Sequence, residues 1–141
     1  MNTQMAEKWL ELTDRDLSGA QILLKSGECI LACYHCSQAV EKALKAYIFS
    51  VLQKSDRDKK YRIHDLIALT RFSELEISEK MLGFIYNLNP LSTEARYEIK
   101  QSKILSQLVP EICNQYVLNT EEFVLWIKSK LYEQQSDLPR G

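Results

Sequence analysis

Residues 32–46 read ACYHCSQAVEKALKA and form the most regular part of this 141-residue chain. From about Glu28 to Gln53, apolar residues recur at intervals of three and four, and no glycine or proline interrupts them. This spacing predicts a long amphipathic helix. Its apolar stripe consists of Cys29, Cys33, Cys36, Val40, Ala43, Leu44, Tyr47, Ile48 and Val51.

The same periodicity predicts further helices at about 3–26, 64–71, 79–88 and 106–134. Four glycines, three prolines and the lack of a β-hairpin pattern favour long helices. We therefore expect an all-α fold, an antiparallel up-and-down bundle of four to five helices. Residues 1–135 would form one domain and 136–141 a tail.

Several residues are expected to mark the helix ends. Thr3 is predicted to cap the first helix, and Gly27 to end it. Ser73 or Ser78 would cap the helix at 79–88, and Asn89-Pro90 would stop it. Pro110 is expected in the first turn of the last helix, where proline is well tolerated.

Composition limits the classes of function. The chain is 45% hydrophobic and 26% charged, with a formal net charge of −1, so we expect no avid non-specific DNA binding. Lys54–Tyr61 is expected to be a charged, hydrated loop. The first residues lack an apolar signal-peptide core, and no apolar run approaches the roughly 18 residues of a membrane span. We therefore expect a cytoplasmic protein with reduced cysteines.

Cys29, Cys33 and Cys36 have the C-x3-C-x2-C spacing of enzymes that bind an iron–sulfur cluster. Here the intervals continue a helical stripe, so a core lining of small apolar residues is the better interpretation. His35 would point about 100° away from Cys36 around the helix, which argues against a zinc site. The sequence therefore predicts neither a metal nor a cofactor.

An ordered set of motifs resembles the HEPN domain family of prokaryotes and of some eukaryotic proteins. The set begins with the Asp14-Arg15-Asp16-Leu17 run, continues through the Tyr34-His35 segment, and ends with Ile63-His64-Asp65-Leu66 and Ala95-Arg96-Tyr97. It spans about residues 9 to 131. The resemblance implies a helical bundle that commonly forms homodimers and acts with a minimal nucleotidyltransferase partner, as in toxin–antitoxin or related two-gene systems.

The polar residues of the central helix are the candidate binding face. Helical spacing places His35, Gln38, Lys42 and Lys45 on one side, and Glu41 four residues before Lys45. One interpretation is an exposed face with ordinary ion pairs, in which the Glu41–Lys45 pair contributes ~0.3–0.5 kcal/mol. The other, which the resemblance supports, is a face that meets a nucleotide, RNA phosphate or a partner protein. Arg96 and Tyr97 would join it.

One branch of the family consists of metal-independent ribonucleases with an arginine four to six residues before a histidine. In that motif the arginine would stabilise phosphate charge and the histidine would transfer protons. Arg96 is followed at 101–103 by Gln, Ser and Lys, and only Arg57 and His64 have the spacing. His64 could instead simply cap the following helix.

Three hypotheses follow from these residues, the last of them a nucleotide sensor that acts alone. The first is a non-catalytic bundle that binds a nucleotidyltransferase. The second is an endoribonuclease toxin in which His35, His64, Arg57 or Arg96 would carry the chemistry.

Overall fold

The computed structural model describes residues 1–54, 64–91 and 106–136. These contain the helices α1 (Thr3–Lys25), α2 (Cys29–Ser50), α3 (Leu66–Ser73), α4 (Glu79–Leu88) and α6 (Pro110–Ser136), and the short 3-10 turn η2 (Asn89–Leu91). No strand occurs among the described residues. The predicted all-α fold is confirmed.

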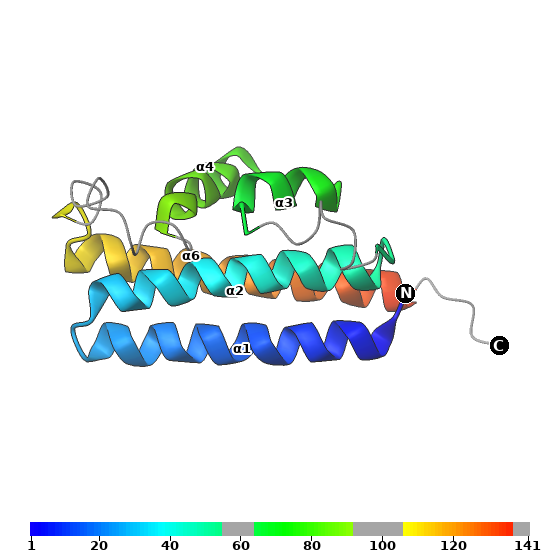
Figure 1. The fold of residues 1–141 in the computed structure, drawn as a ribbon, viewed down its shortest axis with the longest axis horizontal. Helices are drawn as coiled ribbons and strands as arrows, with labels where there is room; N and C mark the ends of the chain where they lie inside the picture. The colour runs from blue at the N-terminus through cyan, green and yellow to red at the C-terminus, as the bar shows by residue number, and fades with distance from the viewer. Residues whose placement is uncertain (55–63, 92–105, 137–141) are drawn as a thin grey trace.

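Three long helices lie side by side, and the short helices α3 and α4 cover them on one side (Figure 1). α1 runs antiparallel to α2 and α6. The short helices α3 and α4, which together form the α3–α4 limb, return the chain from the end of α2 to the end of the bundle where α6 begins. Two side-chain contacts fix the register of α1 against α6: Gln21 to Glu121 at 2.8 Å and Lys128 to Asp14 at 2.8 Å. The bundle is therefore up-and-down, with its third limb divided into two short helices.

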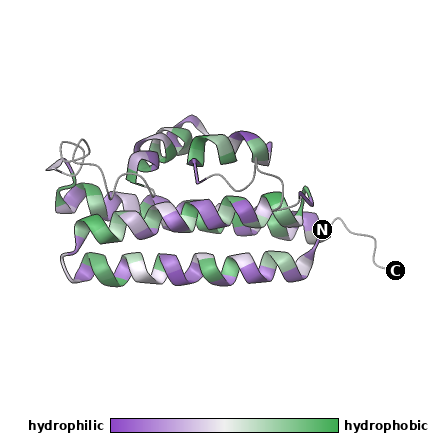
Figure 2. Ribbon diagram, viewed as in Figure 1, coloured by the Kyte–Doolittle hydropathy of each residue, from purple (hydrophilic) through white to green (hydrophobic). Residues whose placement is uncertain are grey.

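The core is centred on α2, which packs against α1, α3 and α6. Hydrophobic and hydrophilic residues alternate around each long helix, as expected for amphipathic helices in a bundle (Figure 2). The largest fully buried side chains include residues of α3 and α4 as well as of the long helices, so the two short helices belong to the same core. They include Phe123, Leu44, Ile48, Leu66, Leu69, Ile85, Leu88 and Ile127.

Two of the expected N-terminal caps are wrong by one residue. Asn2, not Thr3, caps α1, because its side-chain oxygen accepts a hydrogen bond from the backbone N–H of Met5. Asp65, not His64, caps α3 by accepting from Ile67 and Ala68. In both cases the capping residue stands at the position where its side-chain oxygen reaches the free N–H groups of the first turn.

The other end signals are confirmed. Gly27 follows α1 with φ +80, a left-handed conformation that glycine adopts at little cost. Ser78 caps α4 through the N–H of Met81. Pro110 is the first residue of α6. Asn89-Pro90 ends α4 as predicted, although the chain continues with one tighter 3-10 turn from Asn89 to Leu91.

Within the described part of the chain, none of the helices combines the length and the apolar character needed to cross a lipid bilayer.

Candidate functional site

The predicted polar face of α2 exists but is largely covered. Glu41 and Lys45 are buried, with 3% and 6% of their surface exposed, and His35, Gln38 and Lys42 are half-buried. The interpretation as an exposed face is therefore wrong. The side chains lie against α1 and against the residues just before α3.

The first cluster consists of Asp16 of α1 with His35 and Lys42 of α2. Oδ1 of Asp16 lies 2.9 Å from Nδ1 of His35, and its Oδ2 accepts a hydrogen bond from the ammonium group of Lys42. The Asp16 side chain is 11% exposed, so these contacts are shielded from water. The carboxylate of α1 thus joins two α2 residues separated by two helical turns.

The second cluster consists of Glu41 and Lys45 of α2 with His64, which lies just before α3. Oε2 of Glu41 accepts from Nζ of Lys45 at 3.2 Å, and both carboxylate oxygens of Glu41 lie 3.1 Å from Nδ1 of His64. The Lys45 ammonium group also lies 5.9 Å from the centre of the Trp9 ring on α1. This cluster therefore links α1, α2 and the start of α3.

Gln38 occupies the same face of α2, three residues from both His35 and Glu41. Its Nε2 is the one buried side-chain nitrogen or oxygen of the described residues without a hydrogen-bond partner. Leaving such a donor unsatisfied costs about 1–3 kcal/mol. An acceptor brought by a ligand or partner would remove that cost.

The two clusters balance their charges internally. Two carboxylates, Asp16 and Glu41, are matched by two ammonium groups, Lys42 and Lys45. Removing one member of a buried pair leaves the other uncompensated and costs about 3–5 kcal/mol. The Glu41–Lys45 pair does form as predicted from its spacing, but burial places it in this class and not among surface pairs.

Sequence reasoning quoted Asp16 as part of a motif but missed its role in the site. The signal was present, because Asp16 lies between Thr13 and Ala20 on the inward face of α1. A charged residue on the buried side of an amphipathic helix needs a partner. Its partner lies 26 residues away in the sequence, which only the α1–α2 packing reveals.

The structure describes the two predicted catalytic histidines but not the two predicted catalytic arginines. His35 and His64 belong to separate clusters, and among the described residues no hydrogen bond or ion pair joins an arginine to either of them. Arg57, Arg96 and Tyr97 lie outside the described residues. Of the seven residues predicted to form the binding face, the structure brings together five and adds Asp16 and His64.

Cys29, Cys33 and Cys36 lie on the side of α2 that meets α6, where Cys113 of α6 is their neighbour. Cys33, Cys36 and Cys113 are buried and Cys29 is half-buried, and the described cysteines are free thiols. Burial is the main cause that raises the pKa of Cys33 far above its usual range, that of Cys36 to about 12 and that of Cys113 to about 11. The thiols are therefore neutral core residues, in agreement with the interpretation as a core lining.

Comparison with known proteins identifies the fold family. The family model of the HEPN domain matches residues 6–130, which include most of α1, all of α2, both clusters and most of α6. No curated protein and no solved structure matches the chain. Because the match covers most of the sequence, the chain belongs to the HEPN domain family.

Proposed function

We propose that this protein is a non-catalytic HEPN bundle that forms a homodimer and binds a minimal nucleotidyltransferase in a toxin–antitoxin or related two-gene system. The observation that carries the proposal is the internal pairing of the α2 polar face. His35, Lys42 and Lys45 are all engaged by carboxylates of the same chain. Such a face is held in shape before a partner arrives, which lowers the entropic cost of binding.

The unsatisfied Nε2 of Gln38 supports a binding role for this face. Lys42 remains 25% exposed and His35 33% exposed, so both can contact a second molecule without leaving Asp16. The imidazole of His35 and the ammonium group of Lys42, at the edge of the contact between α1 and α2, suit an acceptor-rich ligand, such as a phosphate of a nucleotide shared with the nucleotidyltransferase.

The outer side of α6 supports the homodimer. Leu118, Leu125 and Tyr132 are 47%, 67% and 71% exposed, and their spacing of seven residues places them in one stripe. Ile22 of α1 is 61% exposed and follows Gln21, which donates to Glu121 of α6. An exposed apolar stripe of this kind, ending in a tyrosine, is typical of a protein interface.

Co-purification with a nucleotidyltransferase encoded beside this chain tests the proposal. We expect the tagged protein to capture that enzyme, and Gln38→Ala and Lys42→Ala to reduce capture in samples that circular dichroism shows to be folded. That check is needed because Lys42→Ala leaves Asp16 without its ammonium group. Lys8→Ala, at an exposed position of α1, is the matched control. A monomer in light scattering that captures no enzyme would contradict both parts of the proposal.

One observation favours the endoribonuclease hypothesis. The ring of His64 is 54% exposed while its Nδ1 faces the buried carboxylate of Glu41. A carboxylate that orients an exposed imidazole is the arrangement of a general base. Cleavage of cellular RNA in EDTA that is lost in His64→Ala, Arg57→Ala or Arg96→Ala would establish this activity and reject the non-catalytic proposal.

A further inference from the structure

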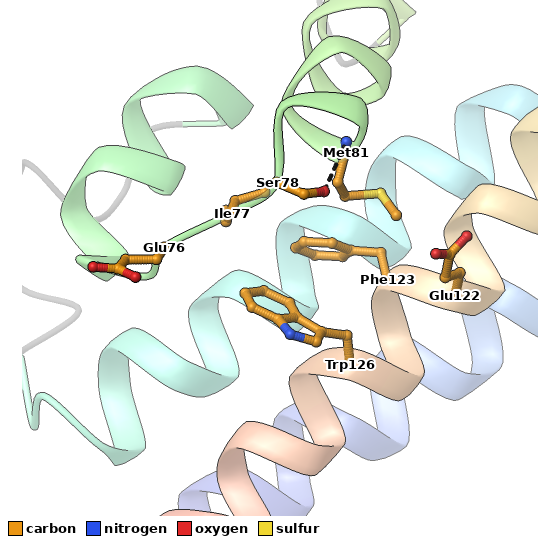
Figure 3. A pocket seen from close by; sticks show the side chains of 7 residues that line it. All are labelled: Glu76, Ile77, Ser78, Met81, Glu122, Phe123 and Trp126. Carbon is orange, nitrogen blue, oxygen red and sulfur yellow. Dashed lines mark hydrogen bonds between the residues drawn. The ribbon is translucent and has the colours of Figure 1, made fainter.

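A small pocket lies between α6 and the chain segment that connects α3 to α4. Its volume is about 250 Å³, and its lining residues are Glu76, Ile77, Ser78, Met81, Glu122, Phe123 and Trp126. Figure 3 shows the rings of Phe123 and Trp126 together on the α6 side, facing the segment from Ile77 to Met81. No residue of the candidate site described above lines it.

The walls combine aromatic faces with carboxylates. The centres of the Phe123 and Trp126 rings are 5.9 Å apart, and Glu76 and Glu122 also line the pocket. In Figure 3 Glu76 lies to the left of the rings, with its carboxylate directed outward, and Glu122 lies to their right. Aromatic faces attract cations through the ring quadrupole, and carboxylates do so by charge. None of the described lining residues is basic.

The surroundings show that these groups already attract ammonium ions from the same chain. Lys80 pairs with Glu122 at 3.3 Å, and Lys130 lies 5.7 Å from the centre of the Trp126 ring. The Lys80–Glu122 pair is well exposed, so it contributes little and exchanges easily with a competing cation. Glu76 is exposed and makes no ion pair with any described residue.

The size of the pocket limits its ligand. Pockets for drug-sized ligands have volumes of about 300–1,000 Å³, so a 250 Å³ pocket suits a single side chain or a slender molecule and not a nucleotide. Met81 and Ile77 provide apolar surface for a hydrocarbon stem, and Met81 adapts readily to shape.

We propose that this pocket binds an aliphatic cation, a guanidinium or ammonium group on a hydrocarbon stem. The charged group lies over Trp126 and near Glu76, and the stem lies against Ile77 and Met81. The ligand is carried either by a basic side chain of a partner protein or by a free polyamine, which share this chemistry.

Titration followed by NMR tests the proposal, because the chain has only two tryptophans and their indole N–H signals report separately. The probe is arginine capped at both ends, its neutral isostere is capped citrulline, and spermidine represents the free polyamine. We expect the Trp126 signal to shift saturably with the capped arginine, with a Kd on the order of 1 mM. Trp9, which faces Lys45 in the α1–α2 seam, is the internal control and should not shift.

Two variants make the result specific. Glu76→Gln removes a lining carboxylate at an exposed position and should weaken binding about tenfold. Glu79→Gln makes the same change in charge close by but outside the lining, and should leave the affinity unchanged. Saturable binding of spermidine with no response to capped arginine would identify the free polyamine as the ligand.

Three outcomes would overturn the proposal. They are an unmoved Trp126 signal with both cations, an equal response to citrulline, and equal weakening by Glu76→Gln and Glu79→Gln. None of them bears on the α2 polar face, so the proposed function would stand or fall separately.

Discussion

The two sides of α2 handle buried polar atoms in opposite ways. On the side that faces α1, Glu41 and Lys45 are buried as a pair of opposite charges. On the side that faces α6, Cys33 and Cys36 are buried without a compensating charge, and their raised pKa keeps them protonated. The α1 side of α2, with the ion pair of Glu41 and Lys45, is called the charged seam here. The α6 side, with the neutral thiols of Cys33 and Cys36, is called the thiol seam.

The difference indicates on which side of α2 the stability of the fold depends on the identity of every side chain. The charged seam requires every member, because an orphaned charge cannot be neutralised without cost. The thiol seam requires only that the side chains be small and weakly polar.

Glu41→Ala is expected to have the largest effect, lowering the free energy of unfolding by about 3–5 kcal/mol. The substitution leaves Lys45 buried without its carboxylate and releases His64 from α2. Urea denaturation followed by circular dichroism measures it. In the double variant Glu41→Leu/Lys45→Met, much of this stability should return, because no unpaired charge remains buried. A loss below 1 kcal/mol for the single variant would place the pair among surface pairs.

Cys33→Ser is expected to cost about 1–3 kcal/mol, because it puts a hydroxyl group where the chain offers only weakly polar thiol neighbours. Cys36→Ser is the matched comparison and should cost less, since the Thr120 side chain lies within hydrogen-bonding reach of residue 36. Thermal unfolding of both variants checks the order. Equal losses would mean that Thr120 does not serve as a partner.

The elements of this fold were predictable, but the burial of the site was not. The spacing of three and four residues and the absence of glycine and proline are local properties, so α2 could be located from the sequence. The placement of His64 on Glu41 spans 23 residues and depends on how the chain returns after α2. The same holds for Asp16, whose partners are on another helix.

The helix caps show that prediction from the sequence is also limited for residues that are neighbours in the chain. Asn2 and Thr3 both carry an oxygen that can cap α1, and only the backbone geometry selects Asn2. For α3, His64 and Asp65 compete in the same way, and the shorter carboxylate is selected while the imidazole contacts Glu41. Neighbouring residues with similar chemistry cannot be ranked without the path of the chain.

The thiol seam predicts a loss of stability at alkaline pH. An unfolded thiol with a pKa of 9.0 releases its proton above pH 9, whereas burial holds the pKa of Cys36 at about 12 in the folded state. The unfolded state then binds fewer protons, so stability is complete below pH 9 and falls as the pH rises towards 12. At pH 10 the ionisation of residue 36 in the unfolded state lowers the free energy of unfolding by roughly 1 kcal/mol. Denaturation at pH 7 and pH 10 measures it, and Cys36→Ala should show a smaller decrease; equal decreases would reject the prediction.

The smallest effect is expected at the surface ion pair that joins α1 to α6. Lys128 and Asp14 are 2.8 Å apart, closer than Lys45 and Glu41 at 3.2 Å, yet their side chains are 37% and 50% exposed. Water already solvates these charges, so Asp14→Asn should cost only about 0.2–1 kcal/mol, and less in high salt. Urea denaturation at two salt concentrations, beside Glu41→Ala, separates distance from burial. If the closer pair proved the costlier one to break, distance and not burial would govern the charged seam, and the contrast between the two sides of α2 would lose its physical basis.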